Sequence, residues 1–232
     1  PPGLQGYLVQ DYPGAAGLLR RALAAQVALT APLLWPLPAP DPAAARRGVV
    51  LHLGGMTSPL ASWDDIAGSV AALVSSVIDA VATQGEALTV MGSAHLAGLG
   101  LGGGPVTVLG DTSPERAAQL IAGASVLITT PGIGAIFEAL SQDTPAILLP
   151  PMNSTQLLHH QVLTVAGLHG LLSAAHQARL TALAGTLDWK QQTLACLALL
   201  RRVGPQLAPP LAQRLSDVAA GPATQTGLST DP

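Results

Sequence analysis

Residues 125–140 read SVLITTPGIGAIFEAL: a short apolar run, a turn that contains proline and glycine, and a stretch with helical spacing. The run Ser125–Thr129 predicts a buried strand, and Ile133–Ser141 predicts a helix that starts after the turn. The same alternation extends upstream to Gly48 and downstream to Leu149. Short apolar strands that alternate with helices predict a parallel sheet covered on both faces, because each parallel connection needs a crossover. The predicted fold class is therefore α/β, with a doubly wound, Rossmann-like parallel sheet.

The other elements follow from the same signals. The further strands are expected at Val49–Leu53, Ala87–Met91, Val106–Leu109 and Pro145–Leu149. The further helices are expected at Ser62–Ala82, Ser113–Ala124, Thr155–Val165, Ser173–Ala184, Trp189–Arg202 and Pro209–Ala219. Ser113 is a suitable N-cap, and the proline and glutamate that follow it favour a first helical turn.

The N-terminal part has a different pattern. Gly6–Gln10 predicts a strand, Ala15–Leu29 predicts a helix, and the proline-dense Leu33–Pro42 predicts an extended linker. Three parts are expected: an N-terminal segment and linker that could be the remnant of a preceding domain (1–47), a Rossmann-like domain (48–203), and a C-terminal helix with a flexible tail (204–232).

Composition excludes several classes of protein. Among 232 residues, 49% are hydrophobic and 10% charged, which excludes disorder as the main state. A formal net charge of −3, with Lys190 the only lysine, leaves no cationic surface for nucleic acid. The single Cys196 excludes an internal disulfide and a cysteine-cluster metal site, so we expect a cytoplasmic protein.

No transmembrane segment is expected. The uncharged stretches 87–110 and 117–137 are long enough to raise the question. The first is rich in glycine, and the second is broken at Pro131, where a lipid-exposed backbone would lose hydrogen bonds.

The loop after the first strand of the sheet is a candidate ligand site. Gly54, Gly55 and Met56 end that strand, and Thr57 and Ser58 follow. Glycines let backbone amides approach a ligand closely, and the hydroxyls suit a phosphate. The alternative is an ordinary tight turn.

The turn after Ser125–Thr129 is a stronger candidate. Its glycines would form the start of a helix, where unpaired N–H groups and the positive dipole end suit a diphosphate. Glu138 follows one turn later among apolar neighbours, where two sugar hydroxyls would satisfy its carboxylate. The alternative is a solvent-facing glutamate. The candidate residues of the turn itself are Thr130, Pro131, Gly132, Ile133 and Gly134.

A third candidate lies after the last strand. Asn153, Ser154 and Gln156 gather amide and hydroxyl groups ahead of a helix, and these groups suit a neutral hexose. Asn153 or Ser154 could instead be an N-cap, whereas Gln156 is too far along the chain for that role. The histidines, His52 included, are expected to be packing or surface residues. The adjacent His159 and His160 point to different helix faces, which is poor geometry for a metal.

These segments together resemble the C-terminal, donor-binding half of GT-B glycosyltransferases, the group that includes the MurG-like and UDP-glycosyltransferase families. The matching residues are Thr130-Pro131-Gly132, Glu138-Ala139-Leu140, Thr144-Pro145, Leu149-Pro150-Pro151 and Gln156. The resemblance implies that Glu138 holds the ribose hydroxyls, that the amides of residues 132–136 hold the diphosphate, and that residues 153–156 hold the sugar. By the same resemblance, Gly54, Gly55 and Met56 match the first donor-side loop.

A narrower likeness and three departures accompany this resemblance. Tyr7–Gln10 and Pro150–Asn153 look like the corresponding segments of cytosylglucuronate synthases. Asp143 stands where the GT-B group usually has glycine, and Thr155 stands where an acid often precedes the glutamine. The histidine often found near Thr130 is absent.

The resemblance implies a domain that binds a nucleotide-diphosphate sugar for transfer to an acceptor, and a UDP-linked sugar is expected. It implies no cofactor and no metal held by side chains, and it assigns no catalytic residue here. About 47 residues precede the sheet domain, so we expect the acceptor domain to be missing or to be a partner subunit, and the chain alone to be inactive. The alternatives are a non-catalytic nucleotide-sugar-binding subunit and a UDP-sugar epimerase of GT-B fold.

Overall fold

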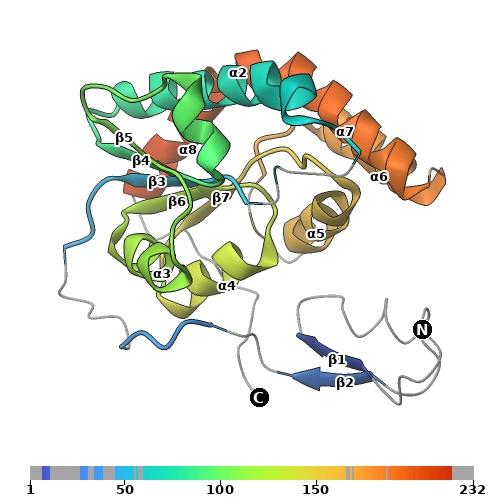
Figure 1. Cartoon of the computed structure of the whole chain (residues 1–232), viewed down its shortest axis with the longest axis horizontal. Coiled ribbons are helices and arrows are strands. Elements are labelled where there is room, and N and C mark those ends of the chain that lie inside the picture. The colour runs from blue at the N-terminus through green and yellow to red at the C-terminus, as the bar shows by residue number, and fades with distance from the viewer. Residues whose placement is uncertain are drawn as a thin grey trace.

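A five-stranded, all-parallel sheet forms the centre of the protein (Figure 1). The computed structural model describes residues 7–10, 27–30, 34–38, 45–54, 56, 60–165, 168, 170–186 and 188–220. The strand order is β5-β4-β3-β6-β7. The strands are β3 (Val49–His52), β4 (Leu88–Met91), β5 (Val106–Leu109), β6 (Val126–Thr129) and β7 (Ala146–Leu148). Because the first strand of this sheet is central and later strands are added on both of its sides, the predicted doubly wound sheet is confirmed.

Helices cover both faces of the sheet, as Figure 1 shows. One face carries α2 (Trp63–Ala82), α7 (Trp189–Val203) and α8 (Ala208–Ala220), with the short 3-10 helix η2 (Gly204–Gln206) between α7 and α8. The other face carries α3 (Pro114–Gly123) and α4 (Ile133–Ser141). The remaining helices are η1 (Ala94–Leu99), α5 (Ser154–Val165) and α6 (Ala174–Thr186). The helices predicted from Ser62 onward therefore form, with small shifts at their ends.

The alternation of side chains along each strand builds two cores. Leu51 of β3 packs on the α2 side, whereas its neighbour Val50 packs on the side of α3 and α4. On the α2 side the core includes Leu211 and Leu215 of α8. Since both faces of the sheet are covered, the strands carry almost continuous apolar runs, which explains why they could be found in the sequence.

Helix α2 is held in place by its ends as well as by its buried face. Ser62 accepts a hydrogen bond from the Asp65 amide, and the Asp65 carboxylate accepts one from the Ser62 amide, which is a capping box. Among the described residues, α2 is the one helix long and apolar enough to cross a membrane. Its apolar side packs into the core with α7 and α8, so burial in the core accounts for its composition.

The N-terminal part differs from the prediction at one strand. β1 (Tyr7–Gln10) confirms the predicted strand and pairs in parallel with β2 (Val27–Thr30). The predicted helix Ala15–Leu29 is therefore wrong over Val27–Leu29, where pairing with another strand overrides the local helical spacing. Its other residues lie outside the described residues, as do Leu33 and residues 39–42 of the linker and the tail from Gly221. Residues 34–38 of the linker belong to no helix or strand.

Candidate functional site

The strand order creates a topological switch point at the carboxyl end of the sheet. After β3 the chain passes to α2 on one face, and after β6 it passes to α4 on the opposite face. The two loops diverge from neighbouring strands, and ligands of doubly wound sheets bind where this happens. We call the region where these two loops meet, joined by the bond from Thr130 Oγ1 to the Gly54 carbonyl, the switch crevice. It brings together two of the three predicted candidate loops.

The carbonyl oxygen of Gly54 ties three loops together beneath the switch crevice. It accepts hydrogen bonds from Thr130 Oγ1 at 3.0 Å and from Gln156 Nε2 at 2.8 Å. Gln156 Oε1 in turn accepts the Met152 amide at 2.9 Å. Both Thr130 and Gln156 are buried. The side chains of Thr130 and Gln156, which were predicted to contact a ligand, therefore link the loops after β3, β6 and β7 to one another.

The third candidate loop makes most of its polar contacts inside the protein. Asn153 Oδ1 accepts the Gln156 amide at 2.9 Å at the start of α5, as an N-cap does. The Ser154 amide donates to Thr193 Oγ1 of α7 at 3.1 Å. These contacts agree with the N-cap alternative for Asn153. Gly55, Thr57 and Ser58 of the first loop lie outside the described residues.

The start of α4 is open toward the switch crevice. Gly132 is the N-cap, and within the described part of the chain no side chain caps the first-turn amides of Ile133 and Gly134. A methyl group added to Gly134 would meet nothing within 4 Å, and one added to Gly132 would meet only the Thr130 carbonyl at 3.7 Å. Pro131 is buried, and its carbonyl bonds to His159 Nδ1 at 3.0 Å. An anion therefore has room in front of the positive end of the α4 dipole.

Glu138 lies in the second turn of α4 and is half-buried. Its Oε1 accepts the backbone N–H of Trp35 at 2.8 Å. Its Oε2 is buried and has no hydrogen-bond partner among the described residues. Burial of Oε2 argues against a purely solvent-facing glutamate, and a buried carboxylate oxygen without a donor is an uncommon, costly arrangement.

A hollow of about 280 Å³ opens beside the switch crevice, at the carboxyl ends of β3, β4 and β5. We call it the His52 hollow. Its polar lining includes His52, Ser93, Asp111 and Thr112. Asp111 Oδ1 accepts the Ala94 amide at 3.2 Å, and Ser93 Oγ is buried without a partner. No lysine or arginine is among its lining residues.

His52 is the functional candidate that the sequence analysis missed. Thr129 Oγ1 donates to the Thr130 carbonyl at 2.9 Å, so it can only accept from His52 Nδ1, which lies 3.4 Å away. This assigns the proton of the neutral ring to Nδ1 and leaves Nε2 as an acceptor. Burial lowers the pKa of His52 to about 4, so the ring is neutral at pH 7. The available signal was its position as the last residue of the first strand of the sheet.

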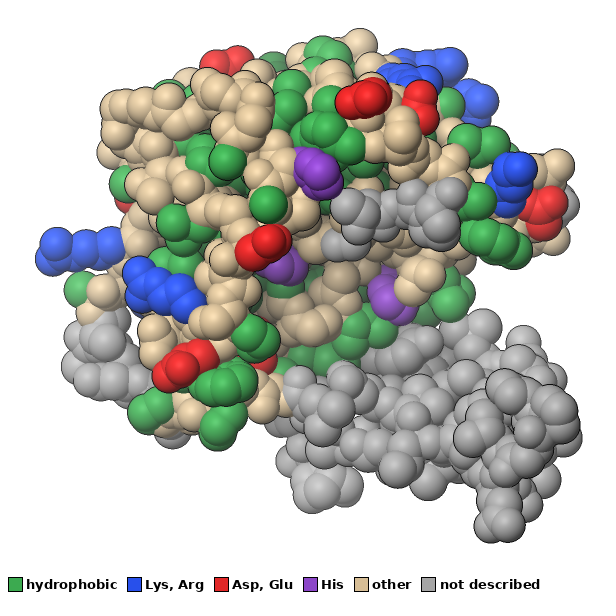
Figure 2. All heavy atoms as spheres, viewed as in Figure 1, with side chains coloured by type: hydrophobic (Ala, Val, Ile, Leu, Met, Phe, Trp, Pro, Cys, Tyr) green, Lys and Arg blue, Asp and Glu red, His purple; other side chains and the backbone are tan. Residues whose placement is uncertain are grey.

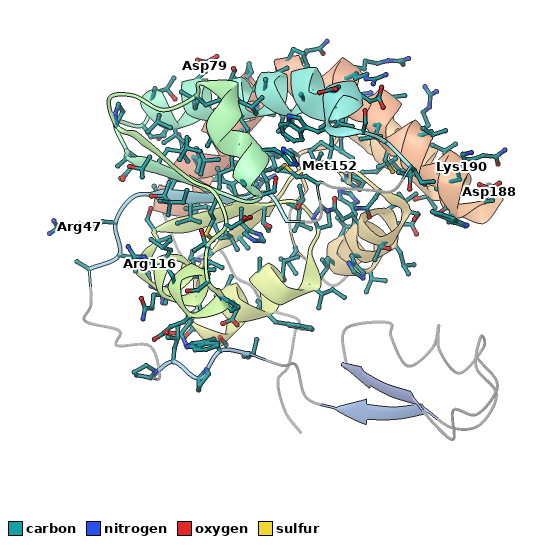
Figure 3. The ribbon with its side chains drawn as sticks, in the orientation of Figure 1. Arg47, Asp79, Arg116, Met152, Asp188 and Lys190 are labelled. Atoms are coloured by element: carbon teal, nitrogen blue, oxygen red, sulfur yellow. The ribbon has the colours of Figure 1, made fainter. Side chains whose placement is uncertain are left out.

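Cationic side chains lie away from the centre of the site. Figure 2 shows a face on which hydrophobic and uncharged polar atoms dominate the middle, with Lys and Arg side chains toward its margins. In Figure 3, Arg47, Arg116 and Lys190 lie toward the periphery, whereas Met152 lies near the middle of the view. Within the described part of the chain, no group of three His, Cys, Asp or Glu side chains is placed to hold a metal ion.

Comparison with known proteins gives distant structural relatives. No family model matches the chain, and no curated protein matches it. The structural neighbours include glycosyltransferases. The glycotransferase of kitacinnamycin is 18% identical with a TM-score of 0.45, over 83% of this chain and 49% of that one. Spinosyn rhamnosyltransferase SpnG, complexed with thymidine diphosphate, is 17% identical with a TM-score of 0.46, over 85% of this chain and 53% of that one.

An epimerase is also similar to the chain. The UDP-GlcNAc 2-epimerase of Methanocaldococcus jannaschii, in complex with UDP-GlcNAc and UDP, is 11% identical with a TM-score of 0.41. The match covers 77% of this chain and 46% of that one. The chain therefore spans about half the length of these relatives. The sequence resemblance to glycosyltransferases is confirmed as a likeness to solved structures.

The structural role of Gln156 can be tested by truncation. We expect Gln156→Ala to lower the free energy of unfolding by about 2–4 kcal/mol, because it leaves the buried Met152 amide unpaired and removes one of two donors to Gly54. Urea unfolding measures the change. Gln206→Ala, at an exposed position in η2, is the control and should stay within about 0.5 kcal/mol of wild type. Wild-type stability of Gln156→Ala combined with weaker ligand binding would instead support the direct sugar contact that the resemblance implies.

Proposed function

We propose that this chain is the donor-binding domain of a glycosyltransferase and binds a nucleoside diphosphate sugar, most simply a UDP-linked one. The observation that carries the proposal is the uncapped start of α4, which opens at the switch crevice one turn before Glu138. An anion site and a carboxylate acceptor at this spacing match the diphosphate and ribose of one ligand. The printed names of the structural neighbours support the same class of ligand.

The diphosphate is proposed to bind the amides at the start of α4. Backbone N–H groups and the helix dipole favour a negative charge there without the help of a lysine or arginine. This suits a site whose neighbouring hollow has no cationic side chain. Gly132 and Gly134 matter because they leave the approach open.

The ribose is proposed to bind Glu138 through its vicinal hydroxyl groups. A carboxylate accepts hydrogen bonds at both oxygens, and bonds to a charged acceptor are the stronger kind. Glu138 Oε2 already lacks a donor among the described residues, so a hydroxyl group would satisfy it.

The His52 hollow suits a neutral part of the ligand that brings hydrogen-bond donors. His52 Nε2 and the Asp111 carboxylate are acceptors, and Thr112 Oγ1 donates to the Gly110 carbonyl at 3.0 Å and so presents an acceptor as well. Nucleobase N–H groups or sugar hydroxyls meet this requirement, whereas a phosphate does not.

Transfer also needs an acceptor and a proton acceptor in a second domain or subunit. In an inverting transfer a positioned base removes the acceptor proton, which typically contributes about 10²–10⁴-fold in rate. We propose that this base comes from the part that corresponds to the other half of the structural neighbours, since the chain spans about half of their length.

Calorimetry tests the proposal directly. Titration with UDP, TDP, CDP, GDP and ADP should give measurable heat and a preference for one base, and uridine without phosphates should bind far more weakly. The sharpest variant is Gly134→Asp. It places a carboxylate at the second residue of α4, where the dipole favours it and nothing lies within 4 Å of the added atom, so the fold is retained.

The same carboxylate repels a diphosphate. We expect at least about 10-fold weaker binding of UDP by Gly134→Asp, which corresponds to 1.4 kcal/mol. Gly68→Asp introduces the same charge at an exposed position of α2 with open space around it, and should bind as wild type does. Absence of heat with every nucleoside diphosphate at millimolar concentration would overturn the proposed function.

A further inference from the structure

The segment Leu34–Pro38 crosses α4 and contacts the carboxylate on which the proposed donor site depends. The backbone N–H of Trp35 donates to Glu138 Oε1 at 2.8 Å, although the two residues are 103 positions apart. Gln142 Nε2, one turn further along the chain, donates to the Pro38 carbonyl at 3.4 Å. We propose that this segment, here called the strap, holds Glu138 in a closed state and must lift before a nucleotide sugar binds. The inference rests on the proposed function.

The two oxygens of Glu138 show why the closed state excludes the ligand. Vicinal ribose hydroxyls need both oxygens of one carboxylate to be accessible. In the present arrangement Oε1 is bonded to Trp35, and Oε2 is buried without a partner. A hydroxyl group cannot reach a buried atom unless the groups around it move. The strap that already occupies Oε1 is the obvious element to move.

The strap is held by two hydrogen bonds to α4 and its C-cap residue and by partial burial of its own first two residues. Leu34 and Trp35 are 37% and 39% exposed, so part of each residue is already in solvent, and the covered remainder adds apolar contacts to the bond at Glu138. Outside the strap, the Arg46 guanidinium donates to the carbonyls of Gln142 and Asp143 at the end of α4. A cation at these carbonyls also complements the helix dipole. Segments with few buried contacts and exposed backbone bonds open first.

Because only the open protein binds, the closed population lowers the apparent affinity for the nucleotide. When only a fraction of the protein is open, the measured Kd equals the intrinsic Kd divided by that fraction. The Trp35 hydrogen bond to a charged acceptor contributes a factor on the order of 10 to the ratio of closed to open protein. Removal of that one donor should then tighten nucleotide binding by up to about 10-fold.

Trp35→Pro removes the backbone donor together with the indole ring. Proline has no backbone N–H, and the position already precedes Pro36, where extended backbone is favoured. Trp35→Ala is the matched control, because it removes the ring and keeps the N–H. In calorimetry with UDP, we expect Trp35→Pro to bind about 10-fold more tightly than Trp35→Ala, because the two variants share the loss of the ring and differ in the N–H that bonds to Glu138.

Hydrogen exchange of the Trp35 amide provides a second measurement on the unmodified chain. The amide should be protected in the free protein and should lose protection when UDP saturates the site. If wild type binds UDP while Trp35→Pro binds no more tightly than Trp35→Ala, or the amide stays protected in the complex, the strap inference is wrong and the proposed function stands. If no variant binds any nucleoside diphosphate, the proposed function fails and the inference fails with it.

Discussion

Glu138→Ala is expected to weaken binding of a nucleoside diphosphate by about 10- to 1,000-fold. Two hydrogen bonds to a charged acceptor are worth about 1.5–3 kcal/mol each. The variant also loses the strap contact at Trp35, so the closed state is less favoured. This makes the binding free energy about 1.4 kcal/mol more favourable and offsets part of the loss. Calorimetry with the preferred nucleotide measures the net change.

The fold of this variant should remain intact. The lost carboxylate has one oxygen without a partner, so its removal takes little from the free energy of unfolding. Glu138→Gln is a conservative variant that keeps one acceptor oxygen at nearly the same volume, and it should give an intermediate loss. Glu86→Ala, at an exposed position two residues before β4, controls for the change in charge. Equal affinity of Glu138→Ala and wild type would make Glu138 an ordinary helix residue.

Acidification is expected to destabilise the protein well before its carboxylates titrate. Burial lowers the pKa of both His52 and His160 to about 4, and burial also lowers the pKa of His159, although its bond to the Pro131 carbonyl opposes the shift. Unfolded histidines titrate near pH 6.5. A group with a depressed folded pKa adds stability above the unfolded value, and this stability is lost as the pH falls toward the folded value.

Proton linkage gives the size of this loss in the free energy of unfolding. With a pKa of about 4 in the folded state, each of His52 and His160 accounts for about 2 kcal/mol of stability lost between pH 7.5 and pH 5. Urea unfolding at the two pH values measures the loss. His160→Met removes a buried ring whose Nε2 has no partner, and His52→Met removes the second ring. Each should make the pH dependence about 2 kcal/mol smaller.

An exposed histidine serves as the control. His95→Gln changes a side chain that stacks on Trp63 at 4.9 Å between ring centroids, and the wild-type pH dependence should remain. Identical free energies of unfolding at pH 7.5 and pH 5 in the wild type would contradict the neutral, buried state of both rings.

Several features of the fold could be predicted from the sequence because local chemistry determines them. The runs at 49–53 and 125–129 are short and apolar, since both faces of the sheet are covered, and the turns after them carry glycine. Helix starts such as Ser113-Pro114 satisfy backbone groups within one turn. These signals lie within a few residues of the structure they specify, so the parallel sheet and the order of its helices could be predicted from the sequence.

Contacts between residues far apart in the sequence could not be predicted from local patterns. Val27–Thr30 carries a helical spacing, and pairing with Tyr7–Gln10 makes it a strand. Gln156 matches the glutamine of the family pattern by residue type and by its order in the chain. Its hydrogen bond to the Gly54 carbonyl, which links two loops, became visible only in the structure.

The amino-acid sequence by itself determined the class of fold, the glycine turns at the strand ends and the position of Glu138 one turn inside a helix. Only the tertiary structure decided that Trp35 bonds to Glu138 across 103 positions, and that His52 faces a hollow with its Nδ1 toward Thr129. The reason is physical. Strand and helix signals come from neighbours along the chain, whereas the protonation and pairing of a side chain depend on burial and on partners that the fold brings together.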